Sequence, residues 1–211
     1  SLDVSQNTQL TYLDCSDNKL SSLDVSQNTQ LMGLHCSYDS LTTLNVSQNT
    51  QLTYLNCSFN QLTTLDISRN TKLTVLCCHG NDLSTQTLDD IYCALPDRTG
   101  KANGKIQPIR NSSSPDLATV LATNKQNAIA KNWKVQYYYP DSADIPATTG
   151  TYVCGTPHPV DTSRYITLTV SNGEVIKLDF KAAAANTSVR IKSGITDTTI
   201  TVGTSWKGIT S

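Results

Sequence analysis

The 211-residue chain has 16 Lys and Arg against 17 Asp and Glu, which gives a formal net charge of −1. Several phosphates cannot be neutralised without a basic excess, so we expect no nucleic-acid partner. No apolar run approaches the ~20 residues of a membrane-spanning helix, so no membrane insertion by this chain is expected. Position 1 falls inside a repeat with no signal peptide before it, which predicts a piece of a longer protein.

Residues 1–84 consist of four gapless copies of a 21-residue unit. Each copy contains L-x-x-L-x-C-x-x-N-x-L, except that Asp39 replaces the Asn of the second copy. A period of 21 falls in the ~20–29 range of leucine-rich repeats. The sequence therefore predicts a leucine-rich-repeat solenoid of parallel β coils over residues 1–84. Each coil is too short for a helix, so we expect strand or turn on both walls.

Each coil should alternate along a short strand such as Leu13-Asp14-Cys15, with the apolar side chains inward. The Asn of the motif can bond backbone groups where the chain turns, and successive Asn residues should stack as a ladder. A second extended stretch, such as Leu2-Asp3-Val4, should point Leu and Val inward from the opposite wall. Stacking the coils then makes one continuous core.

Four of the seven cysteines recur at an inward position of every repeat: Cys15, Cys36, Cys57 and Cys78. Neighbouring coils lie ~4.8 Å apart, so these sulfurs should form a column. Zinc sites favour close pairs such as C-x2-C, which are absent. We therefore interpret the column as apolar packing rather than a metal or redox site, and expect no cofactor. A disulfide among Cys77, Cys93 and Cys154 is left open.

The chain resembles the internalin-J-type leucine-rich-repeat surface proteins of bacteria. The resemblance rests on the 21-residue repeat, its cysteine ladder and the motif L-D-V-S-x-N-T-x-L-T-x-L-x-C. The resemblance is strong over residues 1–84 and loose over 85–139. It implies an exported adhesion or interaction module, secreted or on the cell surface, with host or neighbouring-cell proteins or glycans as partners. It supplies no catalytic motif. The sequence itself also lacks G-x-S-x-G, H-E-x-x-H and a glycine-rich phosphate loop, so we expect no enzyme.

Residues 85–139 predict an α/β cap on the C-terminal end of the solenoid. A helix is expected from Thr87, with Thr87 and Asp90 as a capping box and Pro96 ending it. Its apolar face should cover the last coil, while Cys93 lies off that face. The following elements are expected to be a strand at Gly104–Arg110, a helix from Ser114-Pro115 that includes Leu117, Val120, Leu121 and Ile129, and a strand at Trp133–Tyr139.

Residues 140–150 have the composition of a linker. Residues 151–211 then change to a period of two, which predicts a small antiparallel β module resembling a sandwich. Its expected hairpin runs from Ile166 to Phe180 around Asn172-Gly173, with further strands at Val189–Ile191 and Ile200–Val202. The predicted fold is therefore mostly β, in three parts.

The outward positions of the repeat strands offer aromatic, amide, imidazole and hydroxyl groups for binding. The candidate ligand-binding residues are Tyr12, Asp14, His35, Tyr54, Asn56, Cys77 and His79. A plainly solvated wall is the alternative. His35, Cys77 and His79 are expected to lie too far apart for a tetrahedral metal site. Asp3-x-Ser5-x-Asn7 lacks the Gly and Glu of a calcium loop, and is interpreted as a turn.

The sequence thus predicts a monomeric, non-enzymatic binding fragment of an exported bacterial surface protein that recognises a protein or glycan through its repeat wall. Two alternatives remain. In the first, the fragment is a structural stalk. In the second, it is a carbohydrate-targeting module of a larger enzyme.

Overall fold

The computed structural model describes residues 2–140 and 142–156 in full and, beyond them, the backbone of four short strands. The chain divides into two compact units, Ser1–His158 and Pro159–Ser211. Among the described residues, no helix is both long enough and apolar enough to span a membrane.

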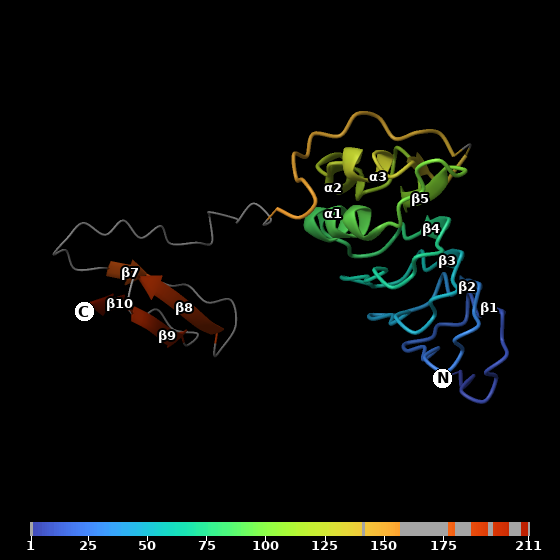
Figure 1. Ribbon diagram of the computed structural model, residues 1–211, viewed down its shortest axis with the longest axis horizontal. Coiled ribbons are helices and arrows are strands. Elements are labelled where there is room, and N and C mark those ends of the chain that lie inside the picture. Colours follow the sequence, from blue (N-terminus) through green and yellow to red (C-terminus); the bar gives the residue numbers. More distant parts are fainter. Residues whose placement is uncertain are drawn as a thin grey trace. The chain divides into compact units, whose positions relative to one another are not determined.

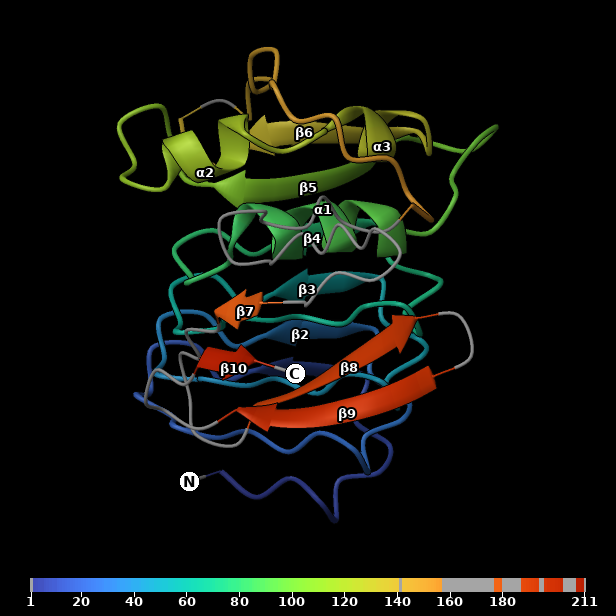
Figure 2. The same cartoon turned by 90° about the vertical axis from the view of Figure 1, so that its left-hand side faces the viewer.

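The first unit is built on a six-stranded parallel sheet in which sequence order is also spatial order (Figure 2). Equivalent residues of successive repeats pair with one another, as Leu13, Leu34 and Leu55 do at the strand centres. This is the parallel solenoid that the repeat predicts. The strands are β1 (Tyr12–Asp14), β2 (Gly33–His35), β3 (Tyr54–Asn56), β4 (Val75–Cys77), β5 (Gly104–Ile109) and β6 (Trp133–Tyr137).

The wall opposite the strands consists of turns. Val25, Val46 and Ile67 point inward from it and are completely buried. Asp24 Oδ1 accepts a hydrogen bond of 2.9 Å from the Ser26 amide, and Asp3, Asn45 and Asp66 repeat this contact. The Asp-x-Ser motif is therefore a backbone turn of the kind that short polar side chains stabilise.

Two asparagine ladders join each coil to the one before it. In the predicted ladder, Asn60 Nδ2 donates to the Cys36 and Cys57 carbonyls at 2.8 and 3.1 Å, while its Oδ1 accepts from the Leu41 amide at 2.9 Å. The second ladder was not predicted from the sequence. It consists of Asn28, Asn49 and Asn70, each donating at 2.9–3.0 Å to two carbonyls of the preceding repeat.

Helix α1 (Thr85–Ala94) follows the last repeat. The predicted start at Thr87 is wrong, because Ser84 Oγ caps the helix by accepting the Thr87 amide at 3.1 Å. The predicted apolar face is buried, with Ile91 and Tyr92 each at most 1% exposed. Figure 1 shows α1 gathered with the two other helices at the β5–β6 end of the unit.

The single helix predicted after Ser114-Pro115 is two short ones, α2 (Leu117–Leu121) and α3 (Gln126–Ile129). The break lies at Thr123, whose buried hydroxyl donates to the Val120 carbonyl at 2.6 Å. The next amide, of Asn124, then donates to Asp89 Oδ1 at 2.8 Å instead of continuing a helix. Ile129, expected on the apolar face, is 43% exposed.

Residues 142–156, which we call the strap, cross the helices and β6. The linker prediction for this region is wrong, because Ile145 is only 1% exposed and its amide donates to the Val135 carbonyl at 2.9 Å. Farther along the strap, the Thr149 amide donates to the Leu121 carbonyl at 2.8 Å. The composition of this segment is typical of a linker, although one of its side chains, that of Ile145, packs in the core.

The second unit is described only as strand backbone. Strands β8 (Thr187–Ser193) and β9 (Thr196–Val202) pair antiparallel, and β10 (Gly208–Thr210) pairs antiparallel with β7 (Lys177–Asp179). The hairpin predicted between Ile166 and Phe180 lies outside the described residues, apart from β7.

Candidate functional site

The outward residues of β1–β6 form one surface, which we call the strand wall. Its two columns are set by strand register: Tyr12, Gly33, Tyr54, Val75, Lys105 and Lys134 in the first, and Asp14, His35, Asn56, Cys77 and Gln107 in the second. Six strands at a spacing of ~4.8 Å make this wall ~24 Å wide. That is wider than the four repeats alone provide.

Three aromatic rings form a row across the first three strands. The His35 and Tyr54 rings stack with centroids 4.5 Å apart, and the Tyr12 ring lies 5.3 Å from His35 at a tilt of 50°. Gly33 makes room for this row, because a Cβ there would lie 2.7 Å from Tyr12 Cδ2. The rings border a shallow hollow of about 400 Å³, with Met32 on its rim.

This part of the wall is open to solvent. Tyr12 is 54% exposed and Met32 is 52% exposed, while His35 and Tyr54 are half-buried. Asp14 is exposed beside them, and its hydrogen bonds from Ser16 lower the pKa of its carboxyl. Four of the seven predicted residues are therefore together and accessible.

Asn56 and Cys77 are buried, at 7% and 1% exposed. Cys77 Sγ donates to Gln107 Oε1 at 3.1 Å, and Gln107 Nε2 donates to the Tyr137 carbonyl at 3.1 Å. Burial raises the pKa of Cys77 to about 11. Asn56 Oδ1 accepts the Ser58 hydroxyl at 2.6 Å. These two side chains hold the wall together rather than face a ligand.

A second set of rings lies just beyond the strand ends, and it was not predicted as a group from the sequence. We call Tyr38, Phe59, His79 and Tyr138 the corner row. Their ring centroids lie 4.3–5.1 Å apart in that order. The Arg110 guanidinium lies 5.5 Å above the Phe59 ring.

The predicted residue His79 belongs to this corner row. It is 1% exposed, and neither ring nitrogen has a hydrogen-bond partner among the described residues. Burial lowers the pKa of His79 to about 4, against a smaller raising effect of the Gln107 backbone. A neutral imidazole packed between Phe59 and Tyr138 is a core group, so His79 does not offer a ligand contact.

Backbone strain marks the corner row. Tyr38 and Phe59 have φ values of +57° and +52°, at the position that Gly80 occupies in the fourth repeat. A bulky side chain in this left-handed region costs ~1–2 kcal/mol, which glycine avoids. The detectable signal in the sequence was a repeat position that varies among Asp, Tyr, Phe and Gly.

Positive charge collects at one end of the strand wall. Lys105 and Lys134 pair directly across β5 and β6, and neither forms an ion pair with any residue that the structure describes. Like charges directly opposite on neighbouring strands repel each other. This end of the wall is therefore suited to an anionic group.

The thiols of the cysteine ladder are buried and protonated. Cys15, Cys36, Cys57 and Cys78 are at most 5% exposed, and all four remain thiols. Burial raises the pKa of each, for Cys15 to about 11. Within residues 2–140 and 142–156, no cluster of three or more His, Cys, Asp or Glu side chains is placed to hold a metal ion.

No protein-family model matches the chain, and no curated protein matches it. Among solved structures it is similar to the functional domain of InlJ from Listeria monocytogenes, which includes a cysteine ladder. The identity is 40% and the TM-score is 0.43. The similarity covers 52% of this chain and 22% of the InlJ chain, so the matched part spans about a fifth of the length of that chain.

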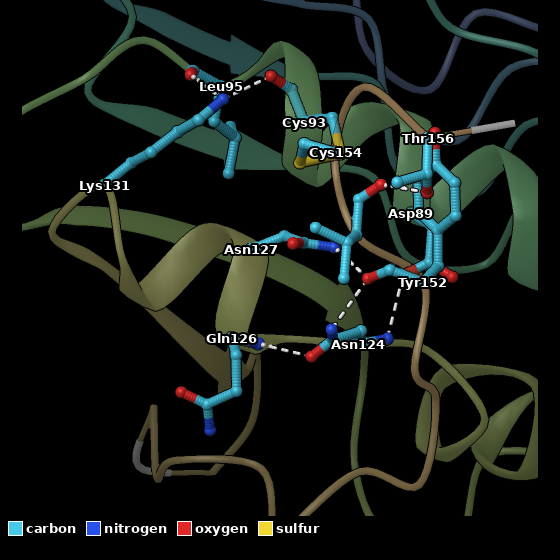
Figure 3. The surroundings of a disulfide bond; sticks show 11 residues. Asp89, Cys93, Leu95, Asn124, Gln126, Asn127, Lys131, Tyr152, Cys154 and Thr156 are labelled. Carbon is cyan, nitrogen blue, oxygen red and sulfur yellow. Dashed lines mark hydrogen bonds between the residues drawn. A yellow bond between two sulfur atoms is a disulfide. The ribbon is translucent and has the colours of Figure 1, made fainter.

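The remaining two cysteines form a disulfide between Cys93, in the last turn of α1, and Cys154, in the strap (Figure 3). The end of α1 is tied a second time by Lys131 Nζ, which donates to the carbonyls of Cys93 and Leu95. The bridge resolves the pairing that the sequence left open. Cys77, the third candidate, stays a free thiol.

Proposed function

We propose that the chain is a non-enzymatic binding module of an exported bacterial surface protein that recognises a protein partner through its strand wall. One observation carries the proposal, namely the open aromatic row of Tyr12, His35 and Tyr54 beside an exposed Met32. Aromatic residues and Met are the types enriched where proteins bind proteins.

Stacking prepares this row for binding. His35 and Tyr54 already hold each other in place, so a partner that contacts them orders few new side chains. Gly33 leaves a depression between the rings that an apolar side chain of the partner fits. A wall that served only to face water would need neither feature.

The two ends of the strand wall carry opposite charges. Asp14 lies on β1, and Lys105 and Lys134 lie on β5 and β6. A complementary partner places an apolar patch over the aromatic row and acidic groups toward β5 and β6. Charges at the edge of an interface chiefly speed association and select the orientation.

The disulfide supports export. Disulfides persist in secreted and surface proteins and are rare in reducing compartments. The Cys93–Cys154 pair is oxidised while five thiols stay buried, which suits a fold that keeps its other cysteines from mispairing. A secreted or cell-surface location fits this pattern.

A protein and glycan array tests the proposal. The purified chain is compared with Tyr54→Ala on the wall and with Asp24→Ala on the opposite, exposed wall. We expect binding to a protein that weakens about 5- to 30-fold in Tyr54→Ala, which is about 1–2 kcal/mol, and is unchanged in Asp24→Ala. Binding that survives Tyr54→Ala contradicts the proposal. A glycan as sole ligand favours the carbohydrate-targeting alternative, and no ligand at all favours the stalk.

A further inference from the structure

The strap is fastened to α2, α3 and the segment between them by hydrogen bonds that follow one another along its length. The Thr149 and Gly150 amides donate to the Leu121 and Thr123 carbonyls at 2.8 and 3.1 Å. Nearer its C-terminal end, the Tyr152 carbonyl accepts the side-chain amide of Asn124 at 2.7 Å. Asn127 Nδ2 donates to the same carbonyl at 2.8 Å.

Such a fastening resists tension poorly. Pulling on the C-terminal end of the strap would load these bonds one after another, starting at Tyr152, so each would break alone. As the strap lifted, Ile145 would leave the core and Lys125 Nζ would lose its bond to the Ile145 carbonyl. Strand β6 would then lose its bridge between Gln136 and Asp144.

The disulfide lies ahead of all these bonds. Cys154 follows Tyr152, so tension that arrives from beyond the strap meets the covalent bridge first. The bridge leads to Cys93 in α1, not to the neighbouring α3 or β6. Figure 3 shows it beside the Lys131 contacts at the helix end.

Helix α1 is a firm attachment point. Leu88, Ile91 and Tyr92 are each at most 2% exposed, so the helix cannot leave without opening the core. The Thr87 hydroxyl also donates to the Thr63 carbonyl of the third-to-fourth repeat loop at 3.2 Å. Chain connectivity then continues from α1 directly into the last repeat.

We propose that the Cys93–Cys154 disulfide is a mechanical clamp. Tension on the chain beyond Cys154 passes through the bridge into α1 and the repeats, and residues 94–153 are outside its path. The clamp keeps β5, β6, α2 and α3 folded while the solenoid is under load. This inference depends on the bridge and the strap, and on no property of a ligand.

Single-molecule force spectroscopy on the full chain, held by tags at its two termini, tests the clamp. In the oxidised chain, unfolding of the first unit should never release residues 94–153. With the reductant TCEP, the same chain should yield at lower force and release about 20 nm of additional length. That length follows from the sequence separation of 61 residues at ~3.3–3.6 Å per residue.

Two variants complete the design. The double substitution Cys93→Ser with Cys154→Ser should behave as the reduced chain does, while Cys77→Ser, which removes a buried free thiol, should keep the oxidised behaviour. Should the double variant not fold, the wild-type chain with and without TCEP decides alone. Release of the 20 nm step in the oxidised chain, an equal first unfolding force with TCEP, or alkylation of both cysteines without reductant each overturns the proposal.

Discussion

His35 lies nearly flat against Tyr54, with ring centroids 4.5 Å apart and planes inclined by 11°. The two residues come from neighbouring repeats and stand at diagonal positions of β2 and β3. Their contact therefore ties two coils together on the solvent side of the sheet, in addition to the backbone bonds between the strands.

A double-mutant cycle measures this contact without a ligand. We expect His35→Ala and Tyr54→Ala together to destabilise the chain by less than the sum of the single changes, with a coupling of about 0.5–1.5 kcal/mol. The measurement is the free energy of unfolding in urea. Additive effects would show that the rings merely lie near each other. Tyr54→Phe, which keeps the stack, is the matched control.

Asp39 is a weak point in the predicted asparagine ladder. Its Oδ1 accepts the Asn18 and Leu20 amides, but its buried Oδ2 has no hydrogen-bond partner, whereas the equivalent Asn60 donates to two carbonyls. We expect Asp39→Asn to raise the free energy of unfolding by about 1 kcal/mol. The exposed Asp24→Asn is the control, and a neutral or destabilising Asp39→Asn would contradict this account.

Acid should destabilise the solenoid through His79. Burial lowers the pKa of His79 to about 4 in the folded chain. Between pH 6.5 and 4, this imidazole is therefore protonated in the unfolded chain and neutral in the folded chain. The free energy of unfolding is therefore not reduced by His79 above pH 6.5. It falls as the pH drops, by up to about 3 kcal/mol at pH 4. Urea unfolding at pH 7 and 4.5 measures it. His79→Leu should remove most of the dependence in this range, and an undiminished slope would rule out His79 as its source.

The cysteine ladder should tolerate apolar replacement. Cys57 is completely buried, so Cys57→Val, which roughly conserves volume, should cost less than ~1.5 kcal/mol. Cys57→Ser should cost more, since it buries a hydroxyl among apolar neighbours. Thermal melts of the two variants decide. Stoichiometric zinc or iron in protein prepared in metal-free buffer would refute the packing interpretation.

The repeat period predicted the sheet because 21-residue spacing alone places equivalent residues in register. The burial of three candidate residues, Asn56, Cys77 and His79, was not predictable in the same way. Cys77 and His79 are covered by Gln107 and Tyr138, which come from β5 and from just beyond β6, outside the period. Nothing in the repeat indicates how a later, non-repeating strand will continue the sheet over its last member.

The strap shows a second limit. Its Pro, Ser, Thr and Ala content is typical of a linker, and Ile145 is the only large aliphatic residue of the strap before Val153. What fixes it is a set of hydrogen bonds to its main chain and a cysteine pair 61 residues apart. Cysteine count alone allowed several pairings, so the partner of Cys93 required the fold.

The second asparagine ladder also limits how the gene of this protein can change in length. Each buried amide, such as that of Asn49, serves only the carbonyls of the repeat before it. A duplication or loss of one whole repeat reproduces the same contact at the new junction. An insertion of any other length moves one asparagine away from its carbonyls and leaves buried polar groups unpaired. Gain or loss of whole repeats therefore widens or narrows the strand wall in whole steps and keeps each buried amide paired.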